Sequence, residues 1–391
     1  MNPHPDVVVI GAGLVGAACA YHLERAGARV LVVDRTGPAG GTTAGGEGNI
    51  LLSDKLPGPE AALVLHSITL WHEMAAHAQS SGGDPFEFDE KGGVVAARAG
   101  QLAPLLELAG RQRAAGITTE VLDTDGIREL EPRISAEIAG GVWYPQDCQV
   151  QPMLAARWLL AEAVRLGAKT EYGAEVIAAQ RASGAEGARL TGVRTSQGVR
   201  PAGAVVNAAG PWCGEVARRL GGWLPVRPRR GHILVTEPLP PLVRHKVYEA
   251  DYVGTVVSDE ASVRCSAVVE GTRAGPVLIG SSREFAGWDR QPALGTLAEM
   301  ARRATALFPF LSGVRAMRCY VGFRPASPDH LPLIGPDASV SGLFHASGHE
   351  GAGIGLAPAT GHLIAALITG TAPAVGPAPF TPARLVKEAA A

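Results

Sequence analysis

Residues 7–34 of this 391-residue chain read VVVIGAGLVGAACAYHLERAGARVLVVD, and this segment carries the strongest signal for the fold. Asp6 to Ile10 is a short β-branched run that predicts a buried strand. Leu14 to Ala26 is alanine-rich and predicts a helix that ends at Gly27, and Arg29 to Val33 predicts a second strand. The stretch therefore has the order, and about the length, of a right-handed crossover between two parallel strands.

The turn between the first strand and the helix matches the pattern GxGxxG. In Gly11-Ala12-Gly13-Leu14-Val15-Gly16 the first glycine allows a tight turn, the second lets the backbone approach a pyrophosphate, and the third lets helix and strand pack closely. Asp34 ends the second strand, where a carboxylate can bind ribose hydroxyls, and this acid argues against a phosphorylated ribose despite the neighbouring Arg35. A dinucleotide site is predicted, with NAD and FAD equally suitable; a glycine-rich turn in another α/β protein is the alternative.

Length and composition indicate a two-domain globular protein that acts on small molecules. The chain is longer than one core usually supports, apolar residues make up 46%, and the formal net charge is −2. This balance offers no basic field for nucleic acid. The cysteines, which form no CxxC pair and predict neither disulfides nor a zinc site, are Cys19, Cys148, Cys213, Cys265 and Cys319.

A cytoplasmic location is expected. The N-terminus MNPHPD lacks the positive segment of a secretory signal. Residues 351–370 are mildly apolar, but they are glycine-rich and contain Pro358 and His362, so a membrane span is not expected.

Further helices and strands follow the first unit. A Gly/Thr loop spans Gly40 to Asn49, and helical and strand-like pieces alternate up to about Val150. Helices are predicted over Arg157 to Leu166, with Gly167 as the C-cap, over 294–308 and over Ile354 to Ile368. Strands are predicted at Thr170 to Val176, Arg189 to Thr195, Ala204 to Asn207, Ile233 to Thr236, Val253 to Val257, Ser262 to Val269, Val277 to Gly280 and Leu343 to Ala346.

The strands from Ile233 to Gly280 are rich in β-branched residues and indicate a largely antiparallel sheet. The strands at Thr170 to Val176 and Arg189 to Thr195 are polar enough to form a hairpin-like excursion. Pro225 to Arg230 marks a crossing between domains.

Two later segments favour a flavin. Gly348-His349-Glu350-Gly351-Ala352-Gly353-Ile354-Gly355 opens the last predicted helix, and this helix start can stabilise negative charge on the pyrimidine edge of a reduced flavin, for which a nicotinamide enzyme has no need. Val205 to Trp212, VVNAAGPW, either lies close to a dinucleotide or simply packs tightly at a strand end. His349 and Glu350 begin the zinc pattern HExxH, but position 353 is glycine, so no metal site is expected.

With these segments in view, the chain closely resembles the D-amino acid oxidase-like flavoproteins. The resemblance is carried, in order, by residues 7–34 and by VVNAAGPWCGEVARRLG, VGFRPASPDHLPLIGP and ASGHEGAGIGLAPATGHLIAALI. The similar subgroup includes glycine and sarcosine oxidases, D-amino acid dehydrogenases, and the FAD subunits of proline, hydroxyproline and opine dehydrogenases and of hydrogen cyanide synthase. The resemblance implies an α/β fold in which a Rossmann-like FAD-binding domain, residues 1–50, 150–225 and 326–391, carries an inserted substrate domain, residues 51–149 and 226–325, with a largely antiparallel sheet.

The resemblance also implies which residues contact FAD. The ADP half would be held by Gly11, Gly13, Leu14, Val15, Gly16, Asp34, Arg35, Val176, Ala209 and Gly210. Thr42, Thr43, Gly48, Asn49 and Ile50 would lie along the pyrophosphate, ribityl chain and ring, although without the resemblance Thr42 and Thr43 are equally well plain loop threonines. The isoalloxazine would be closed by Arg324, Gly348, His349, Glu350, Gly351, Gly353 and Ile354.

Arg324 is the predicted substrate-binding residue. It lies in Gly322-Phe323-Arg324-Pro325, where glycine oxidase-like enzymes place the arginine that grips the substrate carboxylate. On the residues alone, a surface role would be preferred for it. His349 can shape the pocket or be a satisfied buried histidine, and Tyr252, like Tyr248, can flank the ligand or pack in the core or rim.

Two departures limit the resemblance. In monomeric sarcosine oxidases a cysteine six residues before the proline of a Thr-Pro-Asp stretch bonds to the flavin, but here the count from Pro328 reaches Gly322 and Cys319 is out of register, so FAD is expected to be non-covalent. Glycine oxidases carry a carboxylate-binding tyrosine about a dozen residues before the glycine that matches Gly280, where Ala267 and Val268 stand here, which weakens glycine as a substrate.

The predicted reaction is oxidation of the C–N bond of a small amino or imino acid of the D-amino acid, proline or hydroxyproline, or sarcosine or glycine type. Hydride would pass to flavin N5 and give an imine that water hydrolyses. The electron acceptor would be oxygen, a quinone or a partner subunit, and the chain can be a homo- or hetero-oligomer. The alternatives are the FAD-carrying subunit of a heteromeric amino-acid or opine dehydrogenase and an NAD-dependent dehydrogenase.

Overall fold

The first predicted unit lies at the centre of a six-stranded sheet. In the computed structural model, which describes residues 4–182, 189–252 and 263–385, β1 spans Val7–Ile10, α1 spans Leu14–Arg25 and β2 spans Val30–Asp34. β1 pairs in parallel with β2 and with β12 (Ala204–Asn207). The sheet order is β18-β19-β12-β1-β2-β8, with β8 at Lys169–Tyr172, β18 at Leu333–Pro336 and β19 at Leu343–Ser347.

Successive residues of β1 belong to two different cores, which explains why the whole strand is apolar. Val7 and Val9 pack in the core that contains α1, whereas Val8 and Ile10 pack in the core on the other face of the sheet. That other face is covered by a three-stranded antiparallel sheet and by α6 (Cys213–Arg219). The strands of this small sheet are β9 (Val176–Arg181), β10 (Leu190–Thr195) and β11 (Gly198–Pro201).

One predicted strand is divided in the structure. The sequence predicts a single strand from Thr170 to Val176 in a hairpin-like excursion, and this prediction is wrong. Gly173 adopts a φ of 70° after β8, which joins β2 in parallel, and β9 begins only at Val176. The antiparallel excursion therefore consists of β9, β10 and β11.

Helices α5 (Pro152–Leu166), α9 (Gly353–Thr369) and α2 (Pro59–Ser80) form the layer around α1. α5 begins earlier than predicted because Gln151 caps it and Pro152 occupies its first turn, and it ends at Gly167 as expected. Gly361 of α9 lies so close to α1 that a Cβ there would come within 2.5 Å of the Ala18 carbonyl oxygen. Among the described residues one helical stretch, Glu350–Thr369, has the length and composition to cross a membrane, and 61% of its apolar window is buried.

The second sheet has eight strands in the order β17-β13-β16-β15-β14-β4-β6-β5. All neighbours are antiparallel except β14 and β4, which confirms the prediction of a largely antiparallel sheet. The predicted strand at Val253 to Val257 lies outside the described residues. The strands are β4 (Gly93–Ala97), β5 (Glu120–Leu122), β6 (Gly140–Tyr144), β13 (Arg227–Pro238), β14 (Lys246–Glu249), β15 (Arg264–Gly271), β16 (Pro276–Arg283) and β17 (Ala316–Ala326).

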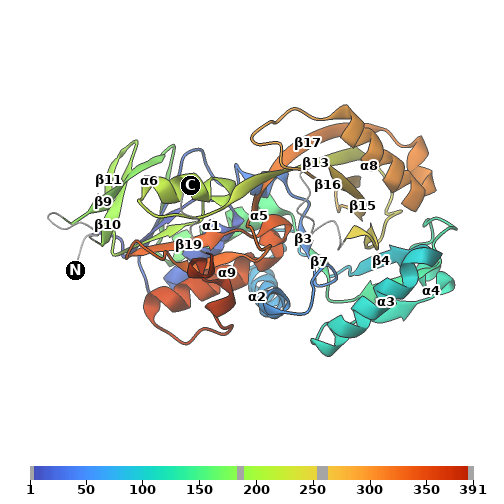
Figure 1. Cartoon of the computed structure of the whole chain (residues 1–391), viewed down its shortest axis with the longest axis horizontal. Coiled ribbons are helices and arrows are strands. Elements are labelled where there is room, and N and C mark those ends of the chain that lie inside the picture. The colour runs from blue at the N-terminus through green and yellow to red at the C-terminus, as the bar shows by residue number, and fades with distance from the viewer. Residues whose placement is uncertain (1–3, 183–188, 253–262, 386–391) are drawn as a thin grey trace.

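The two sheets lie side by side, and the long strands β13 and β17 extend from one toward the other (Figure 1). We propose the domain division expected from the sequence, because the six-stranded sheet is built from residues 7–34, 169–207 and 333–347, and the eight-stranded sheet from residues 93–144 and 227–326. α2, although within the proposed insertion, packs on α9: the Ser67 hydroxyl donates to the Gly355 carbonyl at 2.6 Å.

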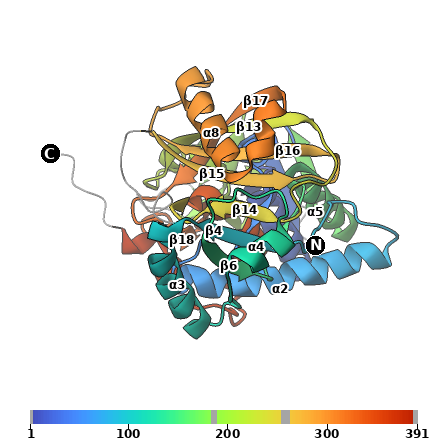
Figure 2. The ribbon, with the colours of Figure 1, turned by 90° about the vertical axis from the view of Figure 1, so that its right-hand side faces the viewer.

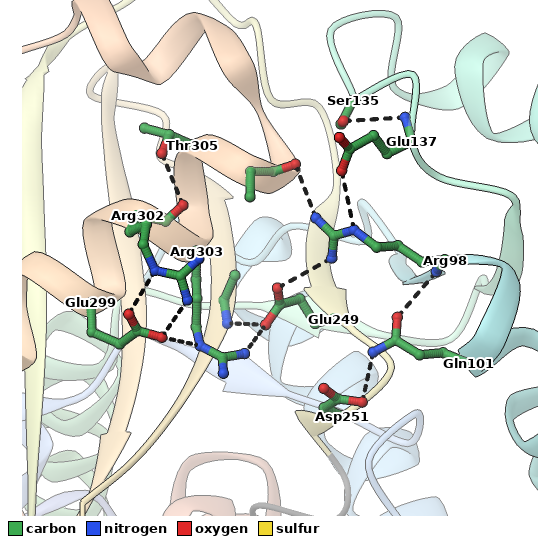
Figure 3. Close-up of polar contacts among 12 residues, drawn as sticks. Arg98, Gln101, Ser135, Glu137, Glu249, Asp251, Glu299, Arg302, Arg303 and Thr305 are labelled. Atoms are coloured by element: carbon green, nitrogen blue, oxygen red, sulfur yellow. Dashed lines mark hydrogen bonds and ion pairs between the residues drawn. The ribbon is translucent and has the colours of Figure 1, made fainter.

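Helices pack on the eight-stranded sheet in two places. Figure 2 shows α8 (Leu294–Leu307) beside β15 and β16, and α3 (Ala99–Ala114) and α4 (Thr124–Leu130) beside β4 and β6. Charged side chains join them (Figure 3): Glu249 accepts from Arg303 Nη1 at 3.0 Å and lies 3.9 Å from Arg98 Nη1. Arg98 also donates to the Ala306 carbonyl at 3.4 Å. This cluster fixes the start of α3 against the end of α8.

Candidate active site

A cavity of about 360 Å³ extends from the six-stranded sheet to the eight-stranded sheet. Asp34 and Val176 line one end, and Tyr252, Arg283 and Arg324 line the other. Most residues predicted to contact FAD line this cavity: Gly11, Gly13, Leu14, Val15, Asp34, Arg35, Thr42, Thr43, Asn49, Val176, Ala209, Gly210, Arg324, His349, Glu350, Gly351, Gly353 and Ile354.

Four predicted contact residues lie behind the cavity wall instead of lining it. A Cβ on Gly16 would come within 1.9 Å of the Gly11 carbonyl oxygen, and one on Gly48 within 2.1 Å of the Val150 carbonyl oxygen. Ile50 is fully buried, and Gly348, with a φ of 77°, forms the turn into the last helix. These residues lie behind the lining and support the cavity wall, and at Gly16 and Gly48 a larger residue would clash with the backbone.

The glycine turn is held by two side chains that the sequence places near it. Asp34 Oδ2 accepts from the Ala12 amide at 2.8 Å, and Thr43 Oγ1 accepts from the Leu14 amide at 3.0 Å. Thr42 donates to the Phe323 carbonyl at 2.6 Å, which ties the turn region to β17. Thr42 and Thr43 are therefore more than plain loop threonines.

Two helix starts open into the cavity, and neither is capped by the side chain of its own N-cap residue, although at α1 Thr43 Oγ1 accepts from the Leu14 amide. α1 has Gly13 at its N-cap and α9 has Ala352, and neither helix carries an acidic residue in its first turn. Free amide groups and the positive end of a helix dipole attract anions. The described residues thus fit a dinucleotide whose pyrophosphate lies at one helix start and whose electron-rich ring edge lies at the other.

The end of the cavity at the eight-stranded sheet is rich in charged side chains. Arg324 donates through Nη1 to the Ser282 carbonyl at 2.8 Å, and Arg283 donates through Nη2 to the Tyr252 hydroxyl at 3.1 Å. Both guanidinium groups approach Gly351, since a Cβ there would lie 3.5 Å from Arg283 Nη2 and 3.6 Å from Arg324 Nε. Two planar donors thus face one small region, which suits a carboxylate.

Glu350 neutralises part of this charge. Its Oε1 lies 3.3 Å from Arg283 Nε, 3.4 Å from Arg229 Nη1 and 3.9 Å from Arg324 Nε. Burial opposes the charge on Glu350, but Arg283, Arg324 and Arg229 outweigh it and lower the pKa of this carboxyl to about 2. The cluster therefore keeps an ionised carboxylate among three guanidinium groups.

His349 and Tyr252 lie where the sequence analysis expects a pocket wall, whereas Tyr248 does not. Burial lowers the pKa of His349 to about 3, so the ring is neutral near pH 7, and its Nε2 lies 2.9 Å from Thr360 Oγ1. Tyr252 packs in the core and also lines the cavity, and its role beside a ligand stays a prediction. Tyr248 is fully buried in the core away from the lining.

Several cavity residues were missed by sequence reasoning. Arg283 ends β16, Glu47 lies within the Gly/Thr loop, and Trp212 packs under Arg35, whose Cζ lies 4.1 Å from the ring centre. Arg283 and Glu47 belong to no motif. The only signal for Glu47 is a single acid among glycines in Gly45-Gly46-Glu47-Gly48.

Together these features define a dinucleotide-dependent oxidoreductase. The profile of the DAO family, FAD dependent oxidoreductase, matches residues 6–367, and the chain belongs to this family. FAD is therefore the cofactor, bound without a covalent link; none of the five cysteines lines the cavity. The NAD-dependent alternative is excluded, and the predicted fold and enzyme class are confirmed.

Known proteins resemble the chain along its whole length. It is 30% identical to the hydrogen cyanide synthase subunit HcnC of Pseudomonas aeruginosa, over 100% of this chain and 99% of that protein. It is 28% identical to glycine oxidase of Pseudomonas putida, over 96% and 98% of the two chains. The crystal structure of glycine oxidase from Geobacillus kaustophilus superposes with a TM-score of 0.86 at 26% identity, covering 98% of this chain and 100% of that one. L-proline dehydrogenase from P. horikoshii shares the fold, with a TM-score of 0.87 at 22% identity and 98% of each chain covered.

Proposed function

We propose that the chain oxidises the C–N bond of a small amino or imino acid whose carboxylate binds to Arg324 and Arg283. The observation that carries this proposal is the convergence of the two guanidinium groups on Gly351, at the start of the helix that would meet the flavin edge. A carboxylate placed there would receive charge-assisted hydrogen bonds from a buried wall, where such bonds are stronger than in water. The names of the relatives, glycine oxidase and L-proline dehydrogenase, support an amino-acid substrate.

The residues of the chain would act mainly by positioning. Bound FAD would supply, at its N5, the acceptor for a hydride from the carbon that bears the substrate nitrogen. Arg324 and Arg283 would fix the carboxylate, and holding the reacting carbon in place recovers the entropic part of the barrier. His349, neutral and hydrogen-bonded to Thr360, would form a rigid part of the wall. We propose that the cavity-lining residues predicted above are the FAD contacts.

The substrate class is tested by anaerobic mixing of the purified holoenzyme with glycine, sarcosine, D-amino acids, D- and L-proline, hydroxyprolines and opines. Bleaching of the yellow flavin band by a member of this panel identifies the substrate. Return of the band in air identifies oxygen as the acceptor, whereas a quinone or a partner subunit would be needed if it does not return. No bleaching by any member would refute the proposed function.

A second candidate function is that of an FAD-carrying subunit of a heteromeric amino-acid or opine dehydrogenase. The relative at 30% identity is itself named a synthase subunit, which favours this reading. Size-exclusion chromatography of the chain expressed alone, combined with the same assay, separates the two functions. A stable, active species supports a stand-alone enzyme. We propose a cytoplasmic location for either.

A further inference from the structure

We propose that Glu47 binds the nitrogen of the substrate, so that the cavity selects a molecule with a carboxylate for the arginines and an N–H group for Glu47. The inference rests on the proposed function and specifies how the amine is recognised. It assigns a binding role to a residue outside every motif of the sequence.

Glu47 lines the cavity, and one of its carboxylate oxygens has no partner among the described residues. It follows the short helix η1 (Thr42–Gly45), and it lines the cavity together with Tyr252 and Arg324. Its residue exposure is 9%. Oε2 accepts from Asn49 Nδ2 at 3.2 Å, whereas Oε1 is buried and has no hydrogen-bond partner among the described residues.

A buried carboxylate oxygen without a donor is costly, because it loses its hydration and gains no hydrogen bond in return. A substrate N–H would provide the missing donor, and a protonated amine would also provide the opposite charge. The orphan oxygen is therefore explained by a ligand that the site is built to take.

Gly280 leaves the space for this carboxylate. A Cβ at Gly280 would lie 2.1 Å from Glu47 Oε1, and any side chain there would displace it. A residue without a side chain at position 280 is therefore compatible with the observed position of the Glu47 carboxylate.

The charges around Glu47 divide the cavity into two halves. One half contains Arg324 and Arg283 with Glu350, and the other contains Glu47. Glu47 interacts electrostatically with Arg324 and favours the charged form of this arginine. Glu47 also favours the charge of the buried Lys246, which is already paired with Glu270. A zwitterionic amino or imino acid matches both halves. A hydroxy acid lacks the positive charge, and a second carboxylate would be repelled.

The test compares ligands that differ only at the nitrogen. Glycine, sarcosine, D-alanine and D-proline are paired with glycolate, methoxyacetate, D-lactate and tetrahydrofuran-2-carboxylate. Dissociation constants are measured with the holoenzyme under anaerobic conditions, from perturbation of the flavin spectrum or from saturation of the reduction rate. The variants are Glu47→Gln, Arg324→Ala and, as a control, Glu73→Gln, an exposed acid on α2.

We expect Glu47→Gln to weaken binding of the amine ligands about 10-fold or more and to leave their oxygen counterparts within about two-fold. Arg324→Ala should weaken both sets, and Glu73→Gln neither. Melting temperature and FAD content show whether Glu47→Gln folds. If it weakens both sets equally, or neither, the role of Glu47 is refuted while the proposed function stands. If no amine reduces the wild-type flavin, the proposed function fails, and the inference fails with it.

Discussion

Glu350 Oε1 lies 3.3 Å from Arg283 Nε, and this contact joins the start of the last helix to the end of β16 inside the protein. Glu350→Gln would keep the shape of the side chain but leave the guanidinium groups of Arg283, Arg229 and Arg324 without their shared anion. Removing one partner of a buried ion pair typically costs about 3 kcal/mol. We expect urea unfolding to show a loss of this size, and Glu73→Gln to show none. An unchanged midpoint would mean that the cluster adds no stability.

Replacing Arg324 with alanine should abolish binding of the substrate carboxylate and leave FAD content unchanged. We expect kcat/KM for the substrate found in the panel to fall about 100-fold or more, because a buried charge-assisted contact is lost. Arg324→Lys should recover part of the loss, since it restores the charge but not the planar fork. FAD content, measured from the flavin absorbance, should hold in both variants. Arg318→Ala, on the exposed part of the same strand, is the control. Unchanged activity would retire the assignment of Arg324.

Gly45→Ala should weaken both the fold and FAD retention. A Cβ at Gly45 would lie 2.8 Å from Gly322 Cα, where η1 meets β17, and neither backbone can give way without moving the cavity wall. Overpacking of this kind costs about 1–3 kcal/mol. Differential scanning calorimetry and FAD titration measure the two effects. Gly100→Ala is the matched control, because nothing lies within 4 Å of its Cβ. Equal behaviour of the two variants would contradict the close contact.

His22 should make the protein less stable in mild acid. Burial, with smaller contributions from His362 and Arg25, lowers its pKa to about 3, whereas an unfolded histidine titrates near about 6.5. Between these values the unfolded chain binds a proton that the folded chain excludes, so stability falls as the pH falls through this window.

Replacing His22 with phenylalanine removes this contribution. Between about pH 7.5 and about pH 5.5 the wild type should lose about 1.4 kcal/mol more than His22→Phe, measured by urea unfolding. His72→Phe, at an exposed position on α2, should follow the wild type. The same acid sensitivity in wild type and His22→Phe would exclude His22 as its source.

The parallel unit around Gly11 was predictable because its signals are local. β-branched runs, glycine spacing and the acid at Asp34 all lie within one short window, and β1, α1 and β2 follow them closely. The sequence does not predict β17, and it predicts one strand over Thr170 to Val176, because pairing with β13 or β2 and not local composition decides these elements. Arg324 was found only through a family resemblance, since one arginine after a strand-like run carries no signal of its own.

The dinucleotide site could be predicted from the sequence, because it is built from backbone amides whose positions depend on glycines close together in the chain. The charged residues at the other end of the cavity come together only in the folded chain. Arg283 and Glu350 are 67 residues apart and meet only because β16 and the last helix start converge on one cavity. Glu47 owes its unpartnered oxygen to the space left by Gly280. Such contacts follow from packing between distant segments, which no local period or spacing encodes.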